Sequence, residues 1–156
     1  MVIHLIRHAH AGHRKGWLGS DQERPLSARG EREAAMLADC LGQAGVDRCW
    51  SSPFVRCRQT LEPLADATGA KVRDRRTLAE GADGTTALDE LVQAAEAGHT
   101  VAACSHGDVI PRMVVAALEG GAELTGPASP AKAGRYELTV VDGCVDRLLY
   151  VPAPTT

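Results

Sequence analysis

The hydrophobic positions along this chain follow two alternating patterns. The first is a short, nearly unbroken apolar run, which is typical of a buried β-strand. Such runs predict strands over residues 2–6, 48–51, 70–73, 100–104, 135–141 and 145–151. The last two runs flank Asp142-Gly143, a dipeptide that favours a tight hairpin turn.

The second pattern places apolar residues three and four positions apart, which marks one face of a helix. It predicts four helices: after Ser27 until Gly42, from Ser52 to Gly69, around 88–95 before Gly98, and over about 109–118 before Gly120. We expect Ser52 to cap the second helix, with Pro53 at its first position. Pro63 lies inside that helix and predicts a kink or a restart.

Strands that alternate with helices imply an α/β protein. We therefore expect a three-layer α/β/α sandwich with a mainly parallel sheet, in which the last two strands form an antiparallel edge. Residues 1–156 are expected to form a single domain, because the chain has the length of one domain and contains no linker or repeat. In such sheets ligands bind at the carboxyl ends of the strands.

Composition narrows the classes of partner. The net charge of -3 and an aromatic content of only 3% argue against nucleic acid and against a charged membrane surface. No apolar segment is long enough to span a bilayer and no leader pattern is present, so we expect a cytoplasmic protein. The five cysteines are odd in number and lack CxxC spacing, so neither a disulfide framework nor a structural zinc site is expected.

Three predicted strands end in residues that suit a phosphate group. The first runs into Arg7-His8, the second into Ser51–Arg56, and the fourth into Ser105-His106. A histidine offers a nitrogen lone pair near neutral pH, and an arginine binds phosphate oxygens in pairs. We expect His8 to attack phosphorus while Arg7 and Arg56 hold its oxygens. His106 would donate a further charge-assisted hydrogen bond.

A leaving alkoxide also needs a proton, so a carboxylic acid is expected at the mouth of this site. Glu80 is the first candidate for that general acid, and Asp83 is the second. The loop after the first strand adds His10, His13, Arg14, Lys15 and Trp17, which could contact the part of a substrate that carries the phosphate.

Other chemistries fit the sequence less well. His4, His8, His10 and His13 crowd the N-terminus, but Arg7 beside them would repel a metal cation, so no metal and no cofactor are expected. Neither Cys49 nor Cys104 has the C-x5-R spacing of a cysteine phosphatase. The chain also lacks the DxDx(T/V) run of an aspartyl-phosphate enzyme, a Walker loop and GxGxxG.

Four blocks of this sequence resemble the histidine phosphatase superfamily, the phosphoglycerate mutase-like proteins. In chain order these blocks are Leu5–Ala9, similar to the family's RHG/RHA signature, Pro25–Gly30, Ser51–Thr60, similar to its S-S-P-x-x-R block, and Ser105–Gly107. The resemblance implies a phosphoglycerate mutase-like fold. It also implies His8 as the phosphorylated nucleophile, and Arg7, Arg56 and His106 as the phosphate pocket.

Within this superfamily the short chain looks like the SixA-type phosphohistidine phosphatases. It is also similar to the histidine phosphatase domain fused to MutT-type Nudix hydrolases, although no Nudix box occurs here. The resemblance implies a phosphatase for which a protein phosphohistidine is the leading substrate, and a small phosphorylated metabolite or nucleotide is the alternative. A non-catalytic phosphate-binding module and, because of the short chain, a mutase rank below these.

Overall fold

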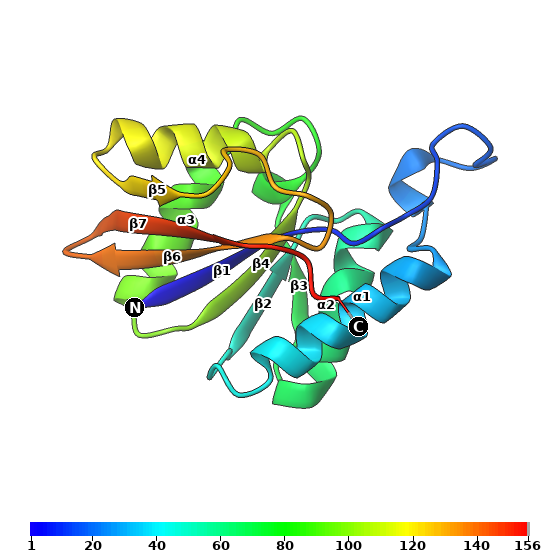
Figure 1. Cartoon of the computed structure of the whole chain (residues 1–156), viewed down its shortest axis with the longest axis horizontal. Coiled ribbons are helices and arrows are strands. Elements are labelled where there is room, and N and C mark those ends of the chain that lie inside the picture. The colour runs from blue at the N-terminus through cyan, green and yellow to red at the C-terminus, as the bar shows by residue number, and fades with distance from the viewer. Residues whose placement is uncertain (156) are drawn as a thin grey trace.

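Strand β1 (Val2–Arg7) lies in the middle of a seven-stranded sheet in the computed structural model, which describes residues 1–155 (Figure 1). The strand order is β3-β2-β4-β1-β6-β7-β5. The other strands are β2 (Arg48–Ser51), β3 (Val72–Asp74), β4 (Val101–Ser105), β5 (Glu123–Thr125), β6 (Arg135–Val141) and β7 (Cys144–Val151). Strands β3, β2, β4 and β1 run parallel to one another, as predicted, whereas β1 pairs antiparallel with β6 on its other side.

Two pairs of helices cover the two faces of this sheet (Figure 1). Helices α1 (Ala28–Leu41) and α2 (Val55–Thr68) pack on one face, and α3 (Thr85–Glu96) and α4 (Ile110–Glu119) on the other. Strand β4 serves both layers: Val101 and Ala103 join the α3–α4 core, while Ala102 and Cys104 join the α1–α2 core. Because successive strand residues point to opposite faces, a strand buried on both faces reads as a continuous apolar run. The three-layer α/β/α sandwich is confirmed.

The far side of the sheet differs from the prediction. Strands β6 and β7 do form an antiparallel hairpin, with positive φ angles of 50° at Asp142 and 77° at Gly143 in its turn. They do not form the edge, however, because β6 pairs with β1 and a further strand, β5, lies outside β7 and parallel to it. The prediction missed β5 because it has only three residues, none of them fully buried.

The start of the second helix was also predicted wrongly. Helix α2 begins at Val55 and its N-cap is Phe54, so Pro53 lies outside it. The Ser52 hydroxyl accepts a hydrogen bond from the Phe54 N–H (3.2 Å), but it also contacts His106 and so belongs to the site described below. Pro63 neither ends nor restarts the helix, which runs through it to Thr68. Within the described residues, no helix is both apolar enough and long enough to cross a bilayer.

Candidate active site

The residues that were predicted to bind phosphate meet in one cavity of about 440 Å³. Strands β2, β4 and β1 are parallel neighbours, with Arg7 opposite Ser105 and Ser51 opposite Cys104. Their carboxyl ends therefore lie at the same edge of the sheet. The structure places Arg7, His8, Arg56 and His106 in the lining of this cavity, together with Glu80.

His8 is held in one tautomer by the backbone. Its Nδ1 lies 2.8 Å from the carbonyl oxygen of Ala9. A carbonyl oxygen only accepts hydrogen bonds, so Nδ1 carries the hydrogen and Nε2 keeps its lone pair. Burial, and then the charges of His106, Arg56 and Arg7, lower the pKa of His8 to about 3, even though the bond to Ala9 favours the protonated form. The ring is therefore a neutral nitrogen nucleophile near pH 7.

His106 is fixed through its other nitrogen. Its Nε2 lies 2.8 Å from the Ser52 hydroxyl and 3.5 Å from the Cys57 sulfur. Its Nδ1 is buried without a hydrogen-bond partner in the described structure. The rings of His8 and His106 meet edge to face, with centroids 5.4 Å apart. Ser52 therefore fixes the orientation in which His106 presents its unbound nitrogen.

The two arginines are anchored by loops distant in sequence. Arg7 donates from Nη1 to the carbonyl of Pro130 (2.8 Å), and its guanidinium packs on Gly107, where a Cβ atom would come within 2.7 Å of it. This contact explains why glycine follows Ser105-His106. Arg56, only 1% exposed, donates to the backbone oxygen of Asp21 (2.8 Å) and to its carboxylate (3.1 Å).

Three buried nitrogens in this cavity have no hydrogen-bond partner in the described structure. They are Arg7 Nε, Arg56 Nε and His106 Nδ1, and they come from three different segments. Buried polar atoms are nearly always hydrogen-bonded, so a group of unsatisfied nitrogens, two of them guanidinium donors, indicates an acceptor that binds there. Of the charged lining residues, five are Arg or Lys and two are Asp or Glu. The cavity therefore suits an anion with several oxygens, such as a phosphate group.

The candidates for the general acid differ in whether their carboxylates line the cavity. Glu80 lines the cavity, where its carboxylate lies 2.9 Å from Arg14 Nη2 and 3.5 Å from Arg56 Nη2. Asp83 does not line it, because its carboxylate accepts hydrogen bonds from the backbone and hydroxyl of Thr85 at the start of α3. Asp108, which the sequence analysis missed, does line the cavity and accepts from the Gly81 N–H (2.9 Å).

The loop after β1, here called the entrance loop (residues 10–17), contributes only some of the side chains that were expected at the cavity. His13 and Arg14 line the cavity, whereas Lys15 and Trp17 line a neighbouring hollow. His10 is absent from both linings. Its ring Nδ1 lies 2.7 Å from the Ser27 hydroxyl that caps α1, and its backbone N–H donates to the Glu33 carboxylate (2.9 Å). His10 therefore holds the start of α1 in place.

Other functional residues escaped the sequence analysis because only the fold brings them here. Asp21 binds Arg56 and Arg24, and Lys132 lines the cavity from the loop before β6. Burial would raise the pKa of Asp21, but the hydrogen bond from Arg24 and the charges of Arg56 and Arg14 outweigh it and lower the pKa. Burial, followed by the charges of nearby arginines, lowers the pKa of Lys132.

Two other residues of the Ser51–Thr60 block have a structural role. The Thr60 hydroxyl accepts from the Ala9 N–H (3.0 Å), and the Gln59 side chain accepts from the Leu26 N–H (2.8 Å). Both bonds fasten α2, which carries Arg56, to the segments on either side of the entrance loop. In the described part of the chain, no three His, Cys, Asp or Glu side chains are grouped so as to hold a metal ion.

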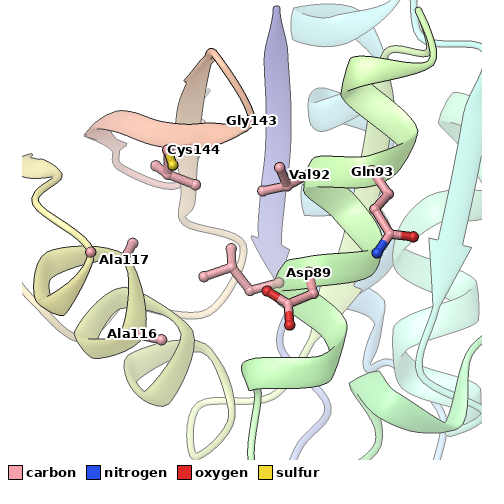
Figure 2. A pocket seen from close by; sticks show the side chains of 10 residues that line it. Asp89, Val92, Gln93, Ala116, Ala117, Gly143 and Cys144 are labelled. Carbon is pink, nitrogen blue, oxygen red and sulfur yellow. The ribbon is translucent and has the colours of Figure 1, made fainter.

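A second cavity, of about 270 Å³, lies at the opposite end of the sheet (Figure 2). Val92 of α3, Ala116 and Ala117 of α4 and Cys144 of β7 line it, and Asp89 and Gln93 add polar groups. It lies between α3, the second half of α4 and the β6–β7 turn.

Comparison with known proteins identifies the family to which this chain belongs. The family model described as "Histidine phosphatase superfamily (branch 1)" matches residues 3–86, which is more than half of the chain. The chain belongs to the histidine phosphatase superfamily. The family assignment from the sequence is confirmed, and with it the class of phosphatases that use a histidine nucleophile.

Similar proteins place this histidine phosphatase near the SixA type. A solved structure of the protein histidine phosphatase SixA complexed with tungstate is 26% identical, with 90% of this chain and 88% of that chain covered and a TM-score of 0.73. A putative phosphohistidine phosphatase SixA from Nakamurella multipartitia is 26% identical, with coverages of 99% and 96% and a TM-score of 0.68.

Among curated relatives, an 8-oxo-(d)GTP phosphatase from Mycolicibacterium smegmatis is 32% identical over 116 residues. The match covers 72% of this chain but only 36% of that protein. This histidine phosphatase therefore spans about a third of the length of that relative.

Proposed function

We propose that this chain is a phosphatase that works through a covalent phosphohistidine on His8. Nε2 of His8 attacks phosphorus, and a P–N bond forms while the bond from phosphorus to the leaving group breaks. Water then attacks the phosphohistidine, releasing phosphate and returning the lone pair to Nε2. The observation that carries this proposal is the neutral His8 ring, whose Nδ1–H is bound to the Ala9 carbonyl.

The other three residues of the predicted pocket neutralise the phosphate. Arg7 and Arg56 bring fixed positive charges, and His106 donates from the nitrogen opposite its contact with Ser52. Phosphoryl transfer depends mainly on positioning and charge neutralisation, so such donors are the main source of catalysis. Support comes from the similar SixA structure, which is complexed with tungstate, an oxyanion with the tetrahedral shape of phosphate.

Glu80 is our first candidate for the group that protonates the leaving atom, and Asp108 is the second. Both carboxylates line the cavity, but each already accepts a hydrogen bond. Glu80 serves as a counter-ion to Arg14 and Arg56, so it would have to exchange these partners for the leaving group. A phosphoramidate makes less demand on this acid, because its leaving nitrogen is protonated easily.

Two substrate classes are supported by different observations. The likeness to SixA proteins and the open cavity support a phosphohistidine side chain of a protein, which is the substrate expected from the sequence. A nucleotide is supported by the relative named as an 8-oxo-(d)GTP phosphatase and by the hollow that adjoins the cavity. Both classes use the same reaction at His8.

Hydrolysis of p-nitrophenyl phosphate and of phosphoramidate tests the reaction. We expect turnover by the wild type, a loss of about 10⁴-fold or more in kcat for His8→Ala, and a ³²P label on the wild type alone after acid-free quenching. The matched control is His99→Ala, because His99 bonds to Asp47 at the other end of β4. Binding of tungstate without any turnover between about pH 5 and 8 would instead identify a phosphate-binding module. Full activity in His8→Ala would show that the nucleophile is wrongly assigned.

A further inference from the structure

The neighbouring hollow, which Lys15 and Trp17 line, opens beside the phosphate cavity. It has a volume of about 300 Å³, and Gly12, His13 and Arg24 line both spaces. Arg24, only 8% exposed, is fixed between them by its bonds to the Ala11 carbonyl (2.7 Å) and to Asp21 (3.0 Å). A molecule whose phosphate lies against His8 can therefore extend past Arg24 into this hollow.

The lining of the hollow combines apolar and cationic groups. Trp17, Pro25 and Leu26 provide apolar surface, and His13, Lys15 and Arg24 are the titratable or charged lining residues; no Asp or Glu lines it. The main cavity differs, because Glu80 and Asp108 line it. The hollow thus offers a flat aromatic surface to a ligand that also carries negative charge.

Trp17 is held in position within an otherwise exposed loop. Its indole N–H donates to the Ser20 carbonyl (2.7 Å), and its backbone N–H donates to the Arg14 carbonyl (3.3 Å). The backbone at Gly19 lies so close that a Cβ atom there would be 3.3 Å from the indole nitrogen. These contacts fix the ring while leaving 39% of the residue exposed. The adjacent Leu18 is fully exposed and lines neither space.

We infer that this hollow binds the nucleoside part of a nucleotide whose terminal phosphate lies against His8. The base would stack on Trp17 against Pro25 and Leu26, and any phosphate nearer the ribose would lie at Arg24 and His13. A nucleobase has the flat face that Trp17 suits and is joined to anionic phosphates, whereas a phosphohistidine imidazole is joined to a neutral peptide backbone. The inference rests on the proposed function and favours the nucleotide class within it.

Steady-state kinetics with two kinds of substrate tests this subsite. GDP and ADP carry a base, and phosphoramidate carries none. We expect Trp17→Ala to lower kcat/KM for the better nucleoside diphosphate by roughly 10-fold or more, mainly through KM, because base stacking is lost. Phosphoramidate turnover should not change. Trp17→Phe should restore most of the lost activity, and Leu18→Ala, the matched control from the same loop, should leave both substrates unaffected.

Each other outcome has a distinct meaning. An equal loss on both substrates, or the same loss in Leu18→Ala, overturns the subsite while leaving the phosphatase in place. Hydrolysis of a phosphohistidine protein that depends on Trp17, without nucleotide turnover, assigns the hollow to a protein substrate and overturns the inference. If the wild type hydrolyses neither phosphoramidate nor a nucleotide, the proposed function itself has failed.

Fluorescence provides a second readout that needs no turnover. The chain has two tryptophans, and Trp50 is 8% exposed with Arg75 stacked 4.0 Å from its ring centroid. Quenching by GDP or ADP should therefore report on Trp17. In the His8→Ala background we expect saturable quenching that Trp17→Phe abolishes and that inorganic phosphate does not produce. Absence of quenching by either nucleotide would contradict the inference.

Discussion

The two cavities at opposite ends of the sheet differ in how they are built. The cavity at the carboxyl ends of β1, β2 and β4 is lined by charged groups from several loops, and three of its buried nitrogens lack partners. The cavity in Figure 2 is lined by side chains of α3 and α4 and by the β6–β7 turn, and none of its described lining residues has a buried unpartnered polar atom. The comparison teaches that the two cavities differ in chemistry more than in volume, because only the first combines unsatisfied buried nitrogens with a lining in which Arg and Lys outnumber Asp and Glu.

The largest effect on activity is expected from the removal of Arg56 from the charged cavity. Arg56→Ala deletes a buried guanidinium from the phosphate cavity and leaves Asp21 without its closest partner on α2. We expect kcat/KM for p-nitrophenyl phosphate to fall by roughly 10³-fold, since one preorganised donor to a transition state contributes about 10²- to 10³-fold. The control is Arg58→Ala on the same helix, whose side chain pairs with Asp74. Equal losses in both variants would contradict the assignment of Arg56.

Acid should weaken the fold through the charged cavity. In the unfolded chain His8 regains its ordinary pKa of 6.5, while in the folded protein burial and nearby charges hold it at about 3. Between these two pH values the unfolded chain binds a proton that the folded chain does not, so the free energy of unfolding falls as pH falls. At about 1.4 kcal/mol per pKa unit, the loss over the whole interval from pH 6.5 to about 3 is roughly 5 kcal/mol.

Urea denaturation of wild type and His8→Gln between about pH 7 and 4 measures this effect. We expect the wild type to lose more stability on acidification than the variant does. Burial also lowers the pKa of His4, so His4 contributes in the same direction to both proteins and cancels in the comparison. Parallel stability curves for the two proteins would refute the prediction.

Truncation of a side chain that lines the cavity of Figure 2 should lower stability without changing activity. Leu88 lines the cavity of Figure 2 and is 7% exposed. Leu88→Ala should lower the free energy of unfolding by about 2–3 kcal/mol, because it enlarges an existing cavity. At a temperature well below unfolding, kcat/KM for p-nitrophenyl phosphate should stay within a factor of two. A large change in KM would mean that the two ends of the sheet are coupled.

The smallest effect is expected at the rim of the charged cavity. Arg14 contacts Glu80 at 2.9 Å and Asp21 at 3.3 Å, but 65% of its side chain is exposed. Exposed ion pairs contribute little, so Arg14→Ala should change the free energy of unfolding by less than about 1 kcal/mol. Its effect on the KM of an anionic substrate should shrink as salt rises from about 0.05 to 0.5 M. A salt-independent effect would indicate a direct, buried contact instead.

The sequence predicted the parts of the molecule that depend on local pattern. The alternation of apolar runs and helical stripes identified the sandwich, and the strand ends located Arg7, His8, Arg56 and His106. It failed where distant contacts decide. Strand β5 is short and half exposed, and Ser52 gave a helix-capping signal although its hydroxyl also contacts His106, 54 positions away.

The counter-ions of the cavity were beyond local reasoning for the same reason. Asp21 looks like a solvated residue of a polar loop, and Lys132 lies in a segment between two strands. Their place beside Arg56 and Arg7 follows only from the packing of loops that are far apart in sequence. Asp83 was the second candidate for the general acid after Glu80, yet its carboxylate accepts hydrogen bonds from Thr85 at the start of α3.

The loop of residues 130–134, which binds the end of β1, affects when this part of the protein can fold during synthesis on the ribosome. The Pro130 carbonyl accepts from the Arg7 side chain, the Gly134 carbonyl accepts from the Arg7 N–H, and the Ala133 N–H donates to the carbonyls of Arg7 and His8. Arg7 and His8 are synthesised more than a hundred residues before these partners. A nascent chain that does not yet contain residues 130–134 lacks these bonds, so Arg7 and His8 reach their folded position only after the loop before β6 has been synthesised.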